Sequence, residues 1–204
     1  MSTNNYNAQI FSGNPLKSFL KRIYWNLFRR PHKQQLGENT FIAPKFSCWA
    51  PSRMKIGTRV NIGPNAQFKI IEKYFNQTFE PKLEIGNDIY IGGNCEIVCM
   101  EQVTIGDGST LSDQIYINDS SHSMDIRQGL IMDRPLTSNG PIAIGESCFI
   151  GLGAAILSGV TLGDHCVVGA KAVVTKSAPP YSMLVGNPAR IVARFDHQVG
   201  GWVD

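Results

Sequence analysis

Aliphatic residues recur along this chain with a period of six. The longest run is formed by Ile144, Ile150, Ile156, Leu162, Val168 and Val174. Shorter runs with the same step lie upstream, at Ile56 and Ile62, at Ile85, Ile91 and Ile97, and at Ile105, Leu111 and Ile117. A six-residue period fits neither an amphipathic helix nor one long alternating strand. It predicts an all-β fold in which short strands turn a corner after each hexad, with three strands per coil of a parallel β-helix.

Two stretches interrupt the period. Residues 69–82 and 123–140 leave the hexad pattern and are predicted to be excursion loops, and the coil at 85–104 carries two extra residues. The second excursion is polar and returns to the pattern at Gly140-Pro141-Ile142. The repeat is predicted to end at Pro179-Pro180, with Ile191–Phe195 returning along the outside as a short strand or helix.

The same pattern divides the chain into three parts. Residues 1–35 are predicted to be an arm with an amphipathic helix at 14–30, residues 36–180 the β-helix, and residues 181–204 a tail packed on it. The helix has two interpretations. It could cap the open end of the solenoid or contact another subunit, which we favour because a β-helix must cover its terminal coil. The alternative is weak docking to an anionic membrane surface.

Composition places few limits on function. The chain has 204 residues, of which 43% are hydrophobic and 17% charged, which fits one soluble domain with a core. A net charge of +3 suits a polyanionic small molecule, a membrane surface or a nucleic acid alike. The five cysteines are odd in number and favour free buried thiols over a disulfide framework. No apolar run is long enough to span a bilayer, and the N-terminus lacks a signal-peptide core.

The hexads and the motifs that close them resemble a known family. His122 is followed by an excursion, and the chain then reads Ile144-Gly145-Glu146-Ser147-Cys148-Phe149-Ile150-Gly151. The repeat ends with Val174-Thr175-Lys176, Pro179-Pro180-Tyr181 and Val185-Gly186-Asn187-Pro188-Ala189-Arg190. Over roughly residues 36–195 the chain resembles the hexapeptide-repeat acyltransferases, especially the sugar O-acetyltransferase branch with galactoside and maltose acetyltransferases and enzymes that acetylate surface polysaccharides. The resemblance implies a left-handed coil and a homotrimer.

His122 is the candidate catalytic residue. An imidazole has an ordinary pKa near neutrality and can take a proton from an alcohol, and the family uses a His at this position as general base. Its second ring nitrogen needs an orienting partner, for which Asn118, Asp119 and a backbone carbonyl are candidates. A zinc enzyme with this fold needs three convergent His ligands, whereas here only His122 and His165 lie in the coils, so no metal is expected.

The resemblance also implies a site for acetyl-CoA in a groove between neighbouring helices of the trimer. Gly151, Leu152 and Ala170 would line the pantetheine arm, beside an aromatic wall at Phe149, and the N–H near Leu152 would hold the oxyanion. The adenine and phosphate end would lie against Thr175, Lys176 and Arg190. Turn geometry accounts equally well for Gly151 and Ala170, and Lys176 and Arg190 also fit ordinary surface charges.

Departures from the galactoside enzymes indicate a different acceptor. Leu152 stands where those enzymes carry a hydroxyl side chain, and Gly92 and Met100 stand where an Asn and an Asp hold the sugar. Tyr90 is retained, and Asn94 or Glu101 are candidate substitutes. The two excursions are the expected location of further acceptor contacts. Arg127 and Arg134 could pair with an acidic sugar or a phosphate, or belong to a solvated loop.

Taken together, these residues predict a cytoplasmic acetyltransferase, with the inner face of the membrane as a second location. It would transfer acetyl from acetyl-CoA directly to a sugar hydroxyl in the biosynthesis of a bacterial surface polysaccharide such as capsule or lipopolysaccharide. Three alternatives stay open: N-acetylation of an amino sugar nucleotide, O-acetylation of an antibiotic, and a β-solenoid scaffold without catalysis. Acetyl-CoA and the sugar acceptor are the expected ligands, and no nucleic-acid partner is expected.

Overall fold

A computed structural model describes residues 36–204 of the chain. The predicted N-terminal arm, the helix at 14–30 and the membrane association assigned to that helix lie outside these residues. Among the described residues no helix is long and apolar enough to cross a membrane.

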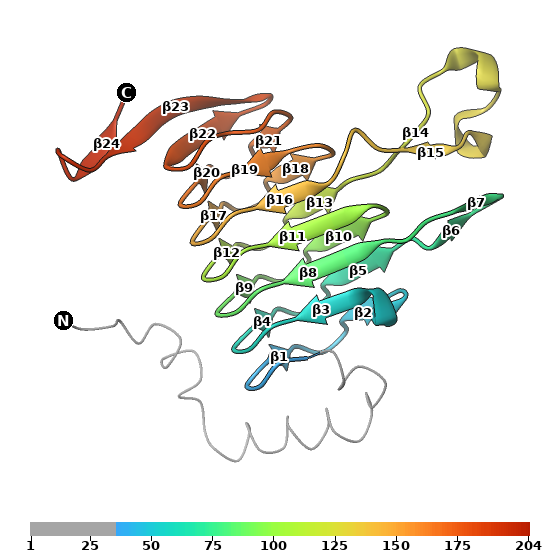
Figure 1. Cartoon of the computed structure of the whole chain (residues 1–204), viewed down its shortest axis with the longest axis horizontal. Coiled ribbons are helices and arrows are strands. Elements are labelled where there is room, and N and C mark those ends of the chain that lie inside the picture. Colours follow the sequence, from blue (N-terminus) through green and yellow to red (C-terminus); the bar gives the residue numbers. More distant parts are fainter. Residues whose placement is uncertain (1–35) are drawn as a thin grey trace. The chain divides into compact units, whose positions relative to one another are not determined.

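The described chain passes through three sheets in rotation, one strand in each, and consecutive coils pair in parallel (Figure 1). The first sheet is ordered β1 (Phe41–Ile42), β4 (Asn61–Ile62), β9 (Tyr90–Ile91), β12 (Thr110–Leu111), β17 (Phe149–Ile150), β20 (Val167–Val168), β22 (Ser182–Gly186), β23 (Ala189–Asp196) and β24 (Gly201–Val203). The second is ordered β2 (Ser47–Cys48), β5 (Gln67–Ile70), β10 (Glu96–Cys99), β13 (Tyr116–Asn118), β18 (Ala155–Leu157) and β21 (Val173–Val174). The third is ordered β19 (Thr161–Leu162), β16 (Ile142–Ile144), β11 (Gln102–Ile105), β8 (Lys82–Ile85) and β3 (Met54–Ile56). This all-β, parallel arrangement is the one that the six-residue period predicts.

The hexad aliphatic residues form the core. In the second sheet Ile97, Ile117 and Ile156 are direct register partners in neighbouring strands, and each is at most 1% exposed. The hexad residues of the other two sheets stack in the same way. Each inward side chain therefore lies on an equivalent one in the coils before and after it, about 4.8 Å away along the stack.

Two of the three corners are closed by close backbone contacts. At the corner between the first and second sheets, which we call the glycine corner, a Cβ on Gly92 would lie 2.6 Å from the nitrogen of Asp113, and one on Gly151 2.7 Å from that of Ala170. At the corner between the third and first sheets, a Cβ on Gly145 would lie 2.7 Å from the nitrogen of Asp164. Any larger residue would push the next coil away, so these corners have little room for insertions.

All the long insertions leave from the remaining corner, between the second and third sheets, which we call the arm corner (Figure 1). The first is a hairpin of β6 (Lys73–Tyr74) and β7 (Gln77–Thr78) between β5 and β8. The second runs from β13 to β16 and contains β14 (Ser121–His122), β15 (Leu136–Thr137) and the 3-10 helices η3 (Ile126–Gln128) and η4 (Ile131–Asp133). A third 3-10 helix, η2 (Pro51–Arg53), and the two extra residues Met100 and Glu101 occupy the same corner. Both predicted excursions are confirmed.

The C-terminal segment extends the first sheet. After Pro179-Pro180, β22 pairs in parallel with β20, and β23 then returns antiparallel to β22. The predicted return at Ile191–Phe195 is therefore a strand, and β24 pairs antiparallel with it.

The five cysteines are free, as predicted, and four of them are buried. Cys148 and Cys166 follow Ser109 in consecutive coils of one inward column. Each side chain donates to a carbonyl of the following coil, from Ser109 Oγ to Gly145 at 2.9 Å and from Cys148 Sγ to Gly163 at 3.2 Å. Small side chains at this place thus connect coils while remaining inside.

Replacing Ile117 by Ala should destabilise the fold by about 2–5 kcal/mol. The substitution would leave a cavity between Ile97 and Ile156, and the in-register pairing of the coils prevents the neighbouring strands from moving in to fill it. The measurement is urea unfolding at fixed protein concentration. Lys55→Ala, on the exposed outer face of β3, is the control and should change stability by less than about 0.5 kcal/mol. Equal losses in both variants would contradict this account of the core.

Candidate active site

His122 lies at the base of the longer insertion, on β14, which pairs antiparallel with β15 so that His122 faces Leu136. The ring is half-buried, and its Nδ1 lies 3.4 Å from the carbonyl oxygen of Arg134. A carbonyl can only accept, so a hydrogen bond here requires the ring proton on Nδ1 and leaves the Nε2 lone pair available. Of the three orienting partners considered from the sequence, the structure brings the backbone carbonyl to the ring.

Asp119 is fully buried and turned toward the preceding coil. Its carboxylate accepts three backbone hydrogen bonds, from the N–H groups of Met100 (2.7 Å), Glu101 (2.8 Å) and Gln102 (2.9 Å). Burial raises the pKa of this carboxyl, and the three N–H groups oppose that rise. The two extra residues of the 85–104 coil thus form a tight corner around Asp119, which supports the segment leading to His122.

Asn118 is also engaged locally. Its side chain donates to the hydroxyl of Tyr116 at 2.7 Å and accepts from the backbone N–H of Ser120 at 2.8 Å. Ser158, one coil further on, donates to the Asp119 carbonyl at 3.0 Å and accepts from the N–H of Asn139 at 2.7 Å. Both ends of the insertion are therefore fastened to the same serine.

The charged residues of the insertion hold its shape. The Arg134 guanidinium is buried and donates twice to the Gly129 carbonyl, at 2.9 and 2.8 Å, and once to the Ser123 carbonyl at 3.3 Å. Arg127 pairs with Asp125 at 2.8 Å on the surface, and that guanidinium lowers the pKa of the Asp125 carboxyl. Of the two arginines considered for an acidic acceptor, Arg134 is occupied by the loop and Arg127 is exposed.

Two residues that the sequence did not single out, Tyr74 and Gln77, contact this insertion from the β6–β7 hairpin. The Tyr74 ring lies edge-on to the His122 ring, with centroids 5.6 Å apart, and its hydroxyl donates to the Met132 carbonyl at 2.6 Å. Gln77 forms two hydrogen bonds with the backbone of Leu136, the register partner of His122. The hexad period could locate the hairpin but not its contacts.

The proposed cofactor residues fall on two corners of the described unit. Gly151, Leu152 and Ala170 lie at the glycine corner, in consecutive coils. Arg190 belongs with them, because its register partner Val185 packs on Gly169. Thr175 and Lys176 follow β21 at the arm corner, on the same side of the second sheet as His122.

Phe149, the last of the cofactor candidates, and the remaining acceptor candidates are spread out. Tyr90 and Phe149 project from the outer face of the first sheet, with Thr110 between them in register, and Phe149 is 44% exposed. Burial raises the pKa of Tyr90. Asn94 lies exposed at the glycine corner, whereas Glu101 lies exposed at the arm corner beside the Asp119 turn. Only Glu101 and the insertion residues share a corner with His122 among these candidates. Within residues 36–204, no group of three or more His, Cys, Asp or Glu side chains could hold a metal ion.

The fold and these corners define a hexapeptide-repeat protein with arms on one corner. A family model described as the hexapeptide repeat of succinyl-transferase matches residues 82–118 and 141–176. A putative acetyltransferase of Staphylococcus aureus is 32% identical over 125 residues, which are 61% of this chain and 61% of that protein. The chain thus matches about three-fifths of the length of this curated relative. The chain is thus similar to hexapeptide-repeat acyltransferases, the family that its motifs resemble.

Two solved structures share the fold. The N-acyltransferase AntD of Bacillus cereus, crystallised as a serine-to-alanine mutant with dTDP-4-amino-4,6-dideoxyglucose and coenzyme A, has a TM-score of 0.69 at 18% identity, covering 90% of this chain and 91% of that one. A galactoside acetyltransferase in complex with coenzyme A has a TM-score of 0.57 at 24% identity, covering 90% of this chain and 81% of that one. At these identities the similarity shows a shared fold and nothing beyond it.

Replacing Asp119 by Ala should lower stability by about 3 kcal/mol, because a buried donor left without an acceptor costs about 1–3 kcal/mol and Met100 is buried. Chemical denaturation measures the loss. Asp113→Ala is the matched control, since the Asp113 carboxylate also accepts from a corner N–H, that of Gly93 at 2.6 Å, but is exposed. A loss no larger than that of the control would show that the Asp119 turn is not structural.

Proposed function

We propose that this protein transfers an acetyl group from acetyl-CoA to a sugar hydroxyl, with His122 as general base. The observation that carries the proposal is the setting of His122, a half-buried imidazole whose Nδ1 faces a backbone carbonyl. This imidazole lies at the corner where the β6–β7 hairpin and the longer insertion meet, and these two segments are called the two arms below. Similarity to hexapeptide-repeat acyltransferases supports acetyl-CoA as the donor. The coil is proposed to have the left hand of that family.

In the proposed reaction, His122 Nε2 takes the proton of the acceptor hydroxyl as its oxygen attacks the thioester carbonyl. The oxyanion that forms is held by a backbone N–H near Leu152. The carbon–sulfur bond then breaks, and the coenzyme A thiolate takes the proton back from the imidazolium. General-base help of this kind is typically worth about 10²–10⁴-fold. No acyl-enzyme is formed, so both substrates must be present together.

The site is proposed to be composite, with residues from two copies of a homotrimer. Within one chain, His122 and Leu152 lie beyond opposite ends of the strands of the second sheet, His122 at the arm corner and Leu152 at the glycine corner. The strands of this sheet have two to four residues, and together with their corners they separate these two ends by roughly 15 Å at 3.3 Å per residue. A thioester between the two residues therefore requires the glycine corner of one copy to lie near the arm corner of another.

The outer faces of the sheets support such packing. The outer positions of the third sheet include Lys55, Glu84 and Thr104, which suit water. Those of the first and second sheets in the later coils are mostly apolar, namely Phe149, Val167, Met183, Tyr116, Ala155, Leu157 and Val173. An apolar outer face on a short parallel sheet favours burial against another protein surface.

The acceptor is proposed to be a sugar of a bacterial surface polysaccharide, modified in the cytoplasm or at the inner face of the membrane. Likeness to AntD keeps the amine of a nucleotide-linked amino sugar as the alternative acceptor. Release of coenzyme A thiol against a panel of sugar alcohols and amino sugars distinguishes the two. An antibiotic acceptor would give turnover with neither group, and a non-catalytic scaffold would not bind coenzyme A.

His122→Ala should reduce turnover about 10²–10⁴-fold, because the acceptor proton then has no base, while the melting temperature stays nearly unchanged. Thiol release and thermal unfolding measure the two quantities. His165→Ala is the control, since His165 is exposed and stacks on Tyr181 with centroids 5.0 Å apart, away from the arms. Full activity in His122→Ala would remove the proposed mechanism.

Mixing two inactive chains should restore activity if the site is composite. His122→Ala lacks the base, and Ala170→Glu places a charge at the glycine corner, so each homotrimer should be inactive. After unfolding and refolding together, mixed trimers should contain intact sites and regain an appreciable part of the wild-type rate. Complete inactivity of trimers verified to be mixed would show that each site lies within one chain.

A further inference from the structure

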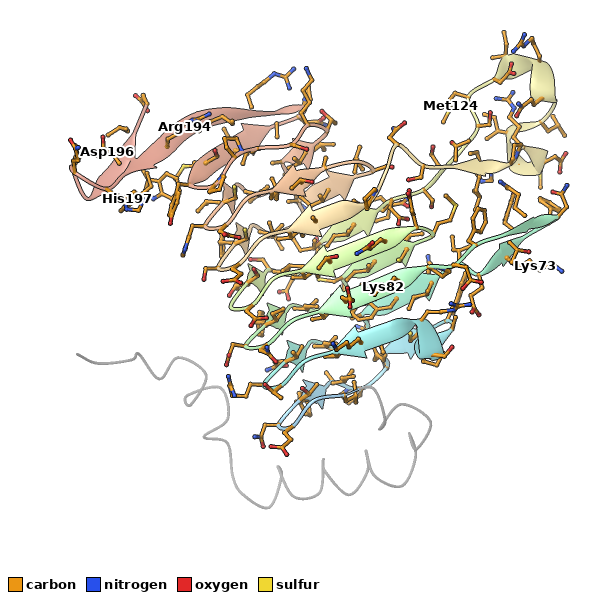
Figure 2. All side chains as sticks on the ribbon, viewed as in Figure 1. Lys73, Lys82, Met124, Arg194, Asp196 and His197 are labelled. Carbon is orange, nitrogen blue, oxygen red and sulfur yellow. The ribbon has the colours of Figure 1, made fainter. Side chains whose placement is uncertain are left out.

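We propose that the β6–β7 hairpin is a positioning element for His122, acting through Gln77 and Tyr74. The inference rests on the proposed general-base role of His122. It adds the hairpin, an element outside the coils and distant in sequence, to the machinery of the reaction. Figure 2 shows Lys73 on this hairpin and Met124 on the longer insertion, the two arms that extend from the same corner.

Gln77 binds β15, the strand that contains Leu136, the register partner of His122. Its Nε2 donates to the Leu136 carbonyl at 3.0 Å, and its Oε1 accepts from the Leu136 N–H at 2.8 Å. Two bonds from one planar amide, to the N–H and the C=O of the same residue, fix both the position and the orientation of the Leu136 backbone. Leu136 pairs with His122 across β14 and β15, and the carbonyl facing the His122 ring belongs to Arg134, two residues earlier.

Tyr74 adds a contact to the ring itself. The phenol ring stands edge-on to the imidazole, at an interplanar angle of 70° and a centroid distance of 5.6 Å. Its hydroxyl is held by the Met132 carbonyl at 2.6 Å, so the ring cannot swing away without breaking that bond. Tyr74 therefore limits rotation of the imidazole on the side facing the hairpin.

The hairpin is fastened at its root by ion pairs and a backbone hydrogen bond. At its root Arg53 pairs with Glu72 at 2.7 Å and also with Glu80, so one guanidinium joins both ends of the hairpin to η2. The Phe79 N–H donates to the Glu72 carbonyl at 2.9 Å and closes the root further. The hairpin thus connects η2, in an early coil, to β15, in the longer insertion.

This arrangement explains how a long contact can orient a base. The 3.4 Å separation between His122 Nδ1 and the Arg134 carbonyl is at the long end of a hydrogen bond, so alone it would fix the tautomer weakly. Gln77 holds the backbone that carries the carbonyl, and Tyr74 holds the ring. Together they keep Nδ1 protonated toward Arg134 and Nε2 free toward the substrate.

The test compares Gln77→Leu, Tyr74→Phe and Tyr74→Leu with the wild type and with Thr78→Val as matched control. Thr78 lies next to Gln77 on β7 and is exposed. Loss of the Gln77 or Tyr74 contacts should lower kcat about 10- to 100-fold in Gln77→Leu and Tyr74→Leu, since small misplacements of a catalytic group cost up to about that factor. KM for acetyl-CoA should stay within about twofold. Tyr74→Phe retains the ring and should lose less than Tyr74→Leu, and Thr78→Val should match the wild type.

A second readout does not depend on activity. The ¹⁵N chemical shifts of the His122 ring, assigned with His122→Ala, should indicate protonation at Nδ1 in the wild type and a mixture of tautomers in Gln77→Leu. Unchanged ring shifts in Gln77→Leu and Tyr74→Leu, with activity that falls only as far as the melting temperature explains, would overturn the positioning role. Full activity in His122→Ala would instead overturn the general-base role, so the two failures are distinguishable.

Discussion

In-register stacking of parallel coils is the constraint on which the rest of this structure depends. Each inward aliphatic residue packs on its counterpart in the coils on either side, as Ile97, Ile117 and Ile156 do. An insertion of one residue within a strand would turn the residues after it to the opposite face of the sheet. Insertions are therefore tolerated only at corners. Two corners are closed by glycines whose missing side chains let backbones touch, which leaves the arm corner as the place where new segments can be added.

That constraint also explains what the sequence could and could not predict. The spacing of the aliphatic residues predicted the sheets, the inward residues and both excursions, because a stacked repeat uses the same position in every coil. The contacts of Tyr74 and Gln77 follow no period. They join segments almost 60 residues apart, and nothing in either segment alone indicates them. The sequence therefore located both arms but not the bonds between them.

Asp119 and Arg134 show why residue type alone was insufficient near the site. An acidic residue close to a candidate base and an arginine in a polar loop both suggested chemistry. Asp119 instead accepts from three N–H groups of a corner formed by two inserted residues in the preceding coil, and Arg134 binds carbonyls of its own loop. Buried charged groups need several hydrogen bonds, and here the unpaired backbone of the irregular segments supplies them. The irregular backbone of these segments thus obtains its hydrogen-bond partners from the two charged side chains.

A neutral carbonyl as the partner of His122 is consistent with the chemistry proposed for it. A carboxylate at that place would stabilise the imidazolium and so favour keeping the proton after it is taken. A carbonyl fixes the tautomer with a smaller charge interaction, which suits a base that must return the proton to a leaving thiolate within the same turnover. Its weaker hold on the ring has to be compensated by packing. The arms provide that packing because the stacked coils allow them to grow from a single corner and meet around the same side chain.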